Sequence, residues 1–369
     1  MDINKMSKVF IALCLAILVV GFTCFSTGCA SSSVGSSNSN GSSAAGASTQ
    51  TITDMAGRDV TIPTDAKKVM GAANPDGIMV YSIDPDMCVG WTFDLNESAK
   101  KYLDPSAASL PKITSISKWE APNEEEILNI SPDFILVSVD LTNVDLSLYD
   151  QITSDTGVPV VVVDAELQNL GNTYRFLGSI LGDSHSTQCN ELADYVDQTF
   201  TDVNATMAKV PTRTRVLYST GNTGLQTCGD SNWNGQFVTP AGGINVCDTT
   251  QTSGFSTVSM EQILSWQPEV IISTVGDSAA SVYSTDEWSK IGAVQNHMIY
   301  SAPKYPFSWV DKPTGANRVI GVKWTNDVLY HDQATYDISK DVTKFYSLFY
   351  HYNLSDSEVN DLLTTKVQY

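Results

Sequence analysis

Side chains that could hold a small molecule gather where the sequence predicts strands to end. Aromatic, amide and charged residues follow short apolar runs in both halves of the chain. In open α/β sheets, the loops after the carboxyl ends of the strands line the ligand crevice. The predicted binding residues are therefore Asn74, Trp91, Lys118, Trp119 and Asp140 in the first half, and Asn222, Trp233, Phe255, Phe307, Ser308 and Trp309 in the second.

The aromatic rings in this set could stack on a planar ligand, which combines a large contact area with a fixed orientation. Trp309 is the strongest candidate, because it lies in a loop between two prolines and outside any periodic stripe. Ordinary core packing remains the alternative for each tryptophan. Arg318 and Lys323 could bind a carboxylate or an oxyanion, but their place in a predicted helix over 315–330 also favours salt bridges.

The sequence offers little for catalysis or for binding a bare metal ion. Gly254-Phe255-Ser256 lacks the second glycine of a GxSxG motif, and no local Ser–His–Asp or Cys–His pairing is present. The four histidines are scattered without an HExxH pattern, and no CxxC spacing occurs. We therefore predict a protein that is not an enzyme and has no intrinsic cofactor or metal site.

Two segments repeat one pattern and predict the architecture. NEEEILNISPDFILVS spans 123–138 and SMEQILSWQPEVIIST spans 259–274, at a constant offset of 136 residues. Each has a polar N-cap with Glu or Gln three residues later, then a proline that ends the helix and an apolar strand. The identical pairs are Glu125/Glu261, Ile127/Ile263, Leu128/Leu264, Pro132/Pro268 and Ile135/Ile271. This pattern predicts one α/β unit used in two similar lobes, with a cleft between them.

The remaining elements are predicted to complete these lobes. A hairpin over 51–63 opens the folded part, and a helical stretch over 169–209 with an apolar stripe connects the lobes. The C-terminal part, 315–369, is expected to be mostly helical. The other predicted strands are 68–72, 87–91, 134–139, 158–163, 215–220, 270–274 and 298–301.

The N-terminus resembles a bacterial export signal with a lipobox. Lys5 and Lys8 precede an apolar stretch over 9–22 that is short for a membrane span, and small residues lead into Cys29. Cys29 would then be acylated, and an ordinary cleaved signal is the alternative. The Ser/Gly-rich stretch 29–50 cannot bury enough apolar surface to fold, so it is expected to be a flexible tether.

The net charge is strongly negative and excludes some partners. It is −20 for the whole chain and −21 without residues 1–28, which contain Asp2, Lys5 and Lys8. This acidity argues against nucleic acid and anionic lipid as partners. Cys228 and Cys247 flank one loop region and could form a disulfide in an oxidising compartment, but the sequence does not assign the connectivity.

Several motifs together resemble one family over about Thr51 to Leu363. They are the hairpin TITDMAGRDVTIP, the paired PDFILVS and PEVIIST units, the inter-lobe helix and PFSWVDKPTGANRVIGVKW. The family is the substrate-binding proteins of ABC importers for iron–siderophore, haem and cobalamin-type ligands. The resemblance implies two α/β lobes joined by one long rigid helix, with small rocking motions around a ligand in the cleft. The expected division is signal 1–28, tether 29–50, first lobe 51–168, inter-lobe helix 169–210 and second lobe 211–369.

The resemblance also implies partners and a location. The expected function is that of a monomeric, lipid-anchored receptor outside the membrane, which captures a ferric siderophore, haem or corrinoid and delivers it to an ABC permease with its ATPase. In this family an acidic side chain on each lobe meets basic residues of the permease. The matching positions here are Glu124, Glu125, Glu126 and Glu261, although acidic first turns also complement the helix dipole.

Three other functions remain open at this stage. A receptor of the same fold for molybdate or tungstate would use convergent N–H, hydroxyl or arginine donors rather than an aromatic bowl. The tryptophans favour the chelate over the oxyanion. A surface sensor or adhesin could use the same fold, and an exported hydrolase has the least support.

Overall fold

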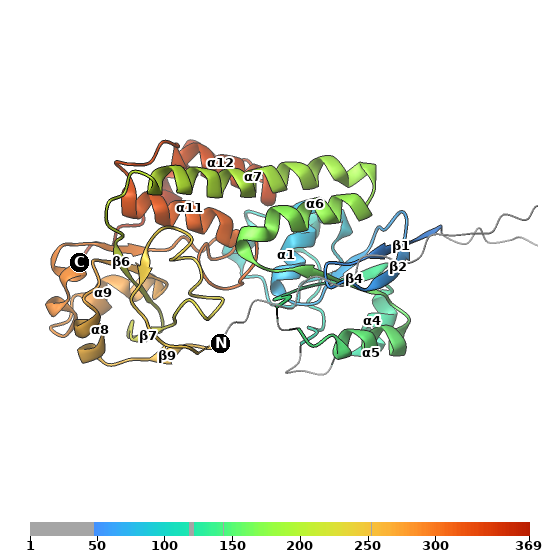
Figure 1. The fold of residues 1–369 in the computed structure, drawn as a ribbon, viewed down its shortest axis with the longest axis horizontal. Coiled ribbons are helices and arrows are strands. Elements are labelled where there is room, and N and C mark those ends of the chain that lie inside the picture. Colours follow the sequence, from blue (N-terminus) through green and yellow to red (C-terminus); the bar gives the residue numbers. More distant parts are fainter. Residues whose placement is uncertain (1–47, 118–121, 143, 252) are drawn as a thin grey trace, which may run out of the picture. The chain divides into compact units, whose positions relative to one another are not determined.

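The computed structural model describes residues 48–117, 122–142, 144–251 and 253–369, and this part of the chain forms two α/β lobes (Figure 1). Each lobe is built on a parallel sheet, with the strand order β3-β4-β5 in the first and β11-β10-β6-β8 in the second. This confirms the predicted fold class. The strands are β3 Val69–Gly71, β4 Phe134–Val139, β5 Val160–Asp164, β6 Arg215–Ser219, β8 Ile244–Asn245, β10 Val270–Ser273 and β11 Ile299–Ser301.

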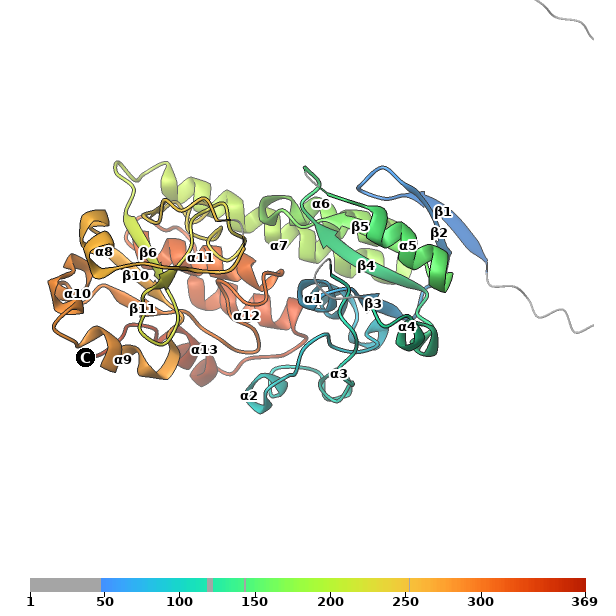
Figure 2. The same ribbon diagram turned by 90° about the horizontal axis from the view of Figure 1, so that it is seen from below.

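Helices surround both sheets (Figure 2). In the first half they are α1 Asn74–Ile83, α2 Glu97–Lys100, α3 Pro105–Ala108, α4 Glu124–Ile130, α5 Ser147–Thr156, α6 Leu170–Ile180 and α7 Asp183–Met207. In the second half they are α8 Met260–Trp266, α9 Ala279–Tyr283, α10 Gly292–Gln295, α11 Asn317–Tyr330, α12 Ile338–Phe349 and α13 Asp356–Leu363. Within the described residues, no helix is both long and apolar enough to span a membrane.

Two small antiparallel pairs complete the strands. The predicted N-terminal hairpin is present as β1 Thr49–Thr53 paired with β2 Asp59–Pro63, and Gly57 in its turn has a φ of 80°. Glycine adopts that left-handed conformation without steric cost. The second pair, β7 Gln226–Thr227 with β9 Ser256–Thr257, lies in the second lobe.

The repeated segments fold as the same unit in each lobe. Helices α4 and α8 both have 7 residues and end at a left-handed residue, Ser131 or Gln267, directly before the proline. The full capping box forms only in α8, between Ser259 and Gln262. In α4 the side chain of Glu126 instead accepts a hydrogen bond from the Thr114 N–H at 3.1 Å. The capping box predicted for α4 therefore does not form, and Glu126 connects α4 to the loop that contains Thr114 instead.

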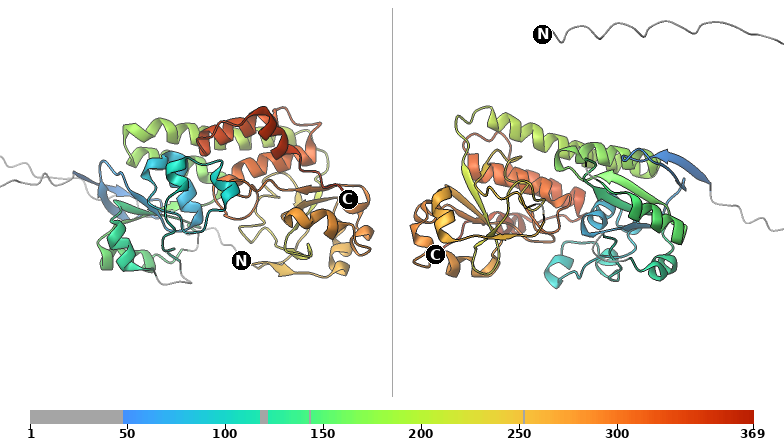
Figure 3. Two further views of the ribbon diagram at one scale, coloured as in Figure 1. Left: turned by 180° about the vertical axis from the view of Figure 1, so that it is seen from behind. Right: turned by 60° about the horizontal axis from the view of Figure 1, so that its bottom comes forward.

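The connector between the lobes differs from the single helix predicted over 169–210. It contains two helices, α6 and the 25-residue α7, which turn at Gly182 with a φ of 81° and pack against each other. A Cβ at Gly178 would lie 2.8 Å from the Cβ of Cys189, so glycine allows this close packing. Figure 3 shows α7 running along both lobes.

The predicted strand over 87–91 is also absent from the described structure. Pro85–Met87 forms a 3-10 turn, and the segment contributes only single bridges, Val69 to Cys88 and Trp91 to Lys112. Proline at the first position of the turn supplies the φ of about −65° that a helical turn needs.

Lys323 makes the salt bridges that its helical position favoured. Its ammonium group lies 2.6 Å from Asp202 of α7 and 2.8 Å from Asp341 of α12, and its side chain is 1% exposed. This buried ion cluster joins α7, α11 and α12.

Candidate functional site

Two of the tryptophans expected to stack on a ligand, Trp91 and Trp309, lie inside the core. Trp91 is 1% exposed and its indole N–H donates to the Ala107 carbonyl at 2.8 Å. Trp309 is 0% exposed, packs edge-on against Trp324 and donates to the Tyr346 hydroxyl at 3.4 Å. Neither ring is open to a ligand in this structure. Trp309 lies in the loop between the two prolines, as predicted, but Trp324 and Tyr346 of the following helices pack against its ring, which is the core packing named as the alternative.

Phe307 connects the two lobes. Its ring lies 6.0 Å from Trp91 and 5.8 Å from Phe93, both of the first lobe, and 5.7 Å from Tyr350. It is 3% exposed. Phe307 therefore holds the lobes together by edge-on aromatic contacts instead of lining an open surface.

Ser308 belongs to a buried hydroxyl network that the sequence did not predict. Its hydroxyl donates to Asp311, whose other carboxylate oxygen accepts from the Tyr218 hydroxyl at 2.6 Å. Burial, together with the Asp311 charge, raises the pKa of Tyr218 well above its usual value. The network fixes the loop before α11 to the end of β6.

A cavity of about 540 Å³ opens at the carboxyl ends of the second sheet. Hydroxyl side chains at the ends of β6, β10 and β11 line it, together with the loop over 303–312 and one tyrosine of the first lobe. These lining residues include Thr220, Ser273, Thr274, Ser301, Ser308 and Tyr102. The strand-end rule thus places a cavity with several hydroxyl groups in its lining where the second lobe meets the first.

Arg318 is the most unusual polar side chain near these strand ends. It is 1% exposed at the start of α11, and its Nη1 donates to the Trp233 carbonyl at 2.9 Å. The Nε donor has no hydrogen-bond partner, and no described carboxylate lies within ion-pair distance. Burial lowers the pKa of Arg318 to about 10, against the opposing effect of Glu166. Because Arg318 stays protonated at pH 7, it is a buried cation, and no described residue forms an ion pair with it.

Trp233 and Phe255 are the half-buried aromatic residues of the predicted set, and each lies beside a cation. The Arg318 guanidinium lies 5.6 Å from the Trp233 ring centroid. The Lys312 ammonium lies 4.4 Å from the centroid of Phe255. Both rings come from segments that follow β6 in the chain, and Asn232, next to Trp233, donates to the carbonyl of Gly254, next to Phe255, at 2.7 Å. The structure thus pairs Trp233 with Arg318 and Phe255 with Lys312.

The first lobe contributes fewer free polar groups. The Asn74 side chain accepts from the Thr92 hydroxyl at 2.6 Å, and the exposed Asp140 carboxylate accepts from the Thr142 N–H and hydroxyl. These bonds lower the pKa of Asp140. Asn222 of the second lobe is exposed and joins none of these groups. Lys118 and Trp119 lie outside the described residues.

Asp76 is a buried carboxyl group that the sequence did not single out. It lies in the first turn of α1, is 2% exposed and accepts from the Ser138 N–H and hydroxyl and from the Ala73 N–H. Burial raises the pKa of Asp76 to about 7, against these hydrogen bonds. Only its first-turn position beside Pro75 could have indicated a special role. Asp76 connects the start of α1 to the end of β4.

The acidic residues expected at a docking face have different environments. Glu124 and Glu125 on α4 are exposed, and so is Glu261 on α8. Glu126 is half-buried, and its carboxylate accepts a hydrogen bond from the Thr114 N–H. Backbone and Ser259 hydrogen bonds lower the pKa of Glu261.

The four described cysteines are free thiols, including Cys228 and Cys247, which are both buried. The Cys247 sulfur lies 3.3 Å from the Thr249 hydroxyl. Cys29 lies outside the described residues. Among the described side chains, no group of three or more His, Cys, Asp or Glu residues could hold a metal ion.

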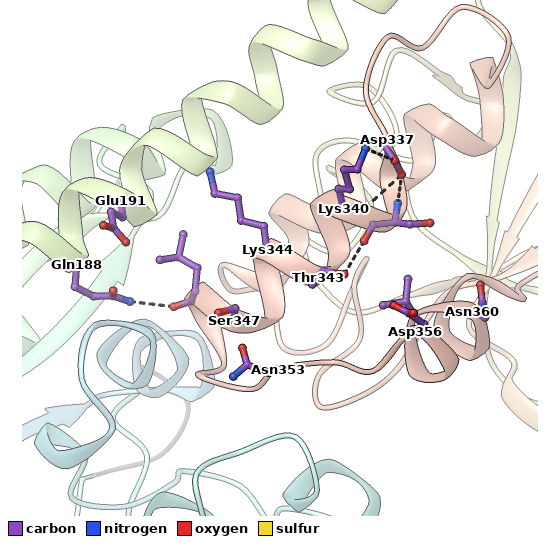
Figure 4. A pocket seen from close by; sticks show the side chains of 13 residues that line it. Gln188, Glu191, Asp337, Lys340, Thr343, Lys344, Ser347, Asn353, Asp356 and Asn360 are labelled. Carbon is purple, nitrogen blue, oxygen red and sulfur yellow. Dashed lines mark hydrogen bonds and ion pairs between the residues drawn. The ribbon is translucent and has the colours of Figure 1, made fainter.

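A second, wider cavity of about 1050 Å³ lies between α7, α12 and α13 (Figure 4). Two of its charged groups, Lys340 and Asp337, pair with each other, and Gln188 donates to the Leu348 carbonyl at 2.9 Å.

Comparison with known proteins gives a consistent result. A family model described as periplasmic binding protein matches residues 85–306. The chain is 23% identical over 322 residues to the molybdate-binding protein MolA of Haemophilus influenzae, covering 81% of this chain and 90% of the relative. It is 21% identical over 256 residues to the uncharacterized ABC transporter substrate-binding lipoprotein YvrC of Bacillus subtilis, covering 68% of this chain and 77% of the relative.

A solved structure extends this similarity to the fold. The ABC transporter solute binding protein from Sulfurospirillum deleyianum is 28% identical, with a TM-score of 0.76. The match covers 85% of this chain and 98% of that protein. These relatives are solute-binding proteins and not enzymes.

Proposed function

The chain belongs to the periplasmic binding protein family and is a substrate-binding protein of an ABC transporter, and from this premise we propose that its cargo is an anion held at Arg318. A buried charge is unfavourable unless an opposite charge or hydrogen bonds compensate for it. Arg318 is almost fully buried, yet its Nε donor is free and no described carboxylate pairs with it. A bound anion would supply the missing partner.

An oxyanion such as molybdate or tungstate is the first candidate. An arginine edge binds oxyanions through charge-assisted hydrogen bonds, and Lys312, which lies over the ring of Phe255, is a second cation of the same lobe. The tryptophans that had favoured a planar chelate, Trp91 and Trp309, are enclosed in the core. The similarity to the molybdate-binding protein MolA supports the same choice.

An anionic metal complex is the second candidate. A ferric siderophore or haem could stack on Trp233, beside Arg318, or on Phe255, beside Lys312, since both rings are half-buried. Haem carries carboxylates that could pair with the same cations. This candidate keeps the cation site and adds an aromatic surface to it.

The proposal also includes how the protein is presented and used. Residues 1–28 would be removed as a signal, Cys29 would be acylated, and residues 29–50 would tether the binding domain outside the membrane. The loaded monomer would then dock on the permease through Glu124, Glu125 and Glu261, without catalysing a reaction. The similarity to a substrate-binding lipoprotein supports this arrangement.

Titration of the purified protein tests the cargo. Calorimetry and thermal unfolding would be measured with molybdate, tungstate, sulfate, ferric siderophores, haemin, cobalamin and cobinamide. A ligand at a hundred times its Kd adds about 2.7 kcal/mol to the free energy of unfolding. Binding of molybdate or tungstate supports the oxyanion, and binding of haemin or of an anionic ferric siderophore supports the second candidate. Binding of neutral solutes alone would overturn the anion proposal, and no binding would favour a sensor or adhesin.

A further inference from the structure

Two leucines at equivalent repeat positions are exposed on the two lobes. Leu128 on α4 is 53% exposed and Leu264 on α8 is 38% exposed. Each follows an isoleucine, Ile127 or Ile263, that is 0% exposed and anchors its helix in the core. Neighbouring helix positions are about 100° apart, so the leucine points away from the face that the isoleucine buries.

The two surfaces match in charge as well as in apolar character. Glu125 precedes Leu128 by three residues, and Glu261 precedes Leu264 by three. Residues three apart are neighbours on a helix surface. Both glutamates are exposed, so each lobe presents a carboxylate beside a leucine side chain. We call each of these pairs an acid–leucine contact.

The fold places both contacts on one side of the described domain. Helices α4 and α8 lie at the lower edge in Figure 1, away from α7, α11 and α12 at the top, and Figure 2 shows them in different lobes. The two helices have the same length and the same type of left-handed end, and in both an exposed glutamate is followed by a buried isoleucine and an exposed leucine. One side of the molecule thus carries two copies of one contact.

We propose that Leu128 and Leu264 insert into two equivalent apolar sockets of a two-fold symmetric membrane partner, each socket bordered by a basic side chain. A duplicated contact fits a partner that is itself duplicated, because each half can then make the same interaction with one lobe. The carboxylates favour a basic partner and the leucines require an apolar recess. A homodimeric ABC permease has the required symmetry, so this inference rests on the proposed function.

Binding of leucine variants to the permease tests the inference. The full chain and its variants L128S, L264S and L128S/L264S would be titrated against the permease–ATPase complex in lipid nanodiscs, without solute and with molybdate. Removing one buried leucine contact should raise Kd about fivefold to tenfold. The two singles should have similar effects, and the double variant should raise Kd about 25- to 100-fold if the contacts act independently.

Ile244 provides a matched control, since it is 41% exposed on β8 but lies outside the repeated unit. I244S should bind the permease like the wild type, and all variants should keep the wild-type thermal midpoint and solute titration. Unchanged solute binding separates a docking defect from a failure of the anion proposal. Wild-type docking of L128S/L264S would overturn the inference, as would an equal loss in I244S. Loss of self-association in the double variant with unchanged permease binding would assign the leucines to a second copy of the chain instead.

Discussion

In the proposed site, Arg318 would contribute to binding by a feature that does not help folding. Its guanidinium group is buried beside Trp233, with one hydrogen bond to a carbonyl and a free Nε. A buried cation held in this way is destabilising until a counter-ion arrives. Binding sites commonly retain such groups because the ligand interaction compensates for them.

The substitution R318M should therefore separate stability from binding. It removes one hydrogen bond, worth about 1 kcal/mol, and the unfavourable burial of a charge. We expect the free energy of unfolding to change by less than about 1 kcal/mol or to rise, while anion affinity falls at least about a hundredfold. Urea unfolding and calorimetry with the bound anion would measure both quantities.

The control is R175M, which removes a half-exposed arginine paired with Asp194 and Asp197 on the connector. R175M should leave anion affinity unchanged. If R318M unfolds readily and binds normally when folded, Arg318 has a structural role and the anion proposal is wrong.

Asp76 should make the stability of the first lobe depend on pH. Burial raises its pKa to about 7 from an ordinary value of 3.8, so the folded state holds the proton more tightly than the unfolded chain does. Its stabilising contribution is complete below pH 3.8 and is lost as the pH rises to about 7. The free energy of unfolding of the wild type should therefore fall between pH 3.8 and about 7 more steeply than that of D76N. The two slopes should differ by up to about 1.4 kcal/mol per pH unit.

Urea titrations at several pH values, with D140N as the control, would measure this effect. The pKa of the exposed Asp140 is lowered by bonds from Thr142, so its contribution has the opposite sign and is lost as the pH falls. Parallel pH profiles for the wild type and D76N would contradict the raised pKa.

At the scale of elements, the salt bridges of Lys323 connect three helices. Its ammonium group lies between Asp202 of α7 and Asp341 of α12, while its own helix is α11. Removing one partner of a buried ion cluster leaves uncompensated charge, here two nearby carboxylates. We expect K323M to lower the free energy of unfolding by about 3–5 kcal/mol.

Urea unfolding at pH 7 would test this prediction, with K340M as the matched control. Lys340 pairs with Asp337 at 3.0 Å, but its side chain is 84% exposed. Exposed pairs contribute about 0–1 kcal/mol, so K340M should stay close to the wild type. Equal effects of the two substitutions would show that burial does not determine the strength of the Lys323 cluster.

The sequence predicted elements well where a local signal was strong. The repeated helix–proline–strand units, the hairpin and the helix over 315–330 all occur, because caps, prolines and alternation act within a few residues. The break between α6 and α7 depends on Gly182 in a left-handed conformation, which no periodic pattern reveals. The predicted strand over 87–91 failed because Pro85 begins a turn.

The site was harder to predict because burial depends on contacts distant in sequence. Trp309 lies in a proline-flanked loop, yet Tyr346 and Trp324 enclose it. From the sequence, Arg318 was expected to form a salt bridge on its helix. The structure shows instead that it bonds the carbonyl of Trp233, 85 residues earlier in the chain, and a contact at that sequence distance has no local signal. Strand-end reasoning therefore pointed to the region of the candidate site but could not separate the residues buried in the core from the residues open to a ligand.

For the whole molecule, the connector predicts small relative movements of the lobes. Helix α7 is continuous over 25 residues, and its Gln188 donates both to Ser82 of α1 and to Leu348 of α12. Phe307 adds aromatic contacts from the second lobe to the first. Packed helices that span both lobes permit sliding or rocking but resist a wide hinge motion.

Spin labels on Asn129 of α4 and Ser265 of α8, introduced as unnatural amino acids, would measure this movement by pulsed electron resonance. Both positions are exposed and equivalent in the repeat. We expect the mean distance between the labels to change by about 3 Å or less when a bound anion is added, since the helices stay packed. F307A removes the inter-lobe ring contacts and should broaden the distance distribution without solute. A ligand-induced change beyond about 10 Å in the wild type would show that the connector acts as a hinge.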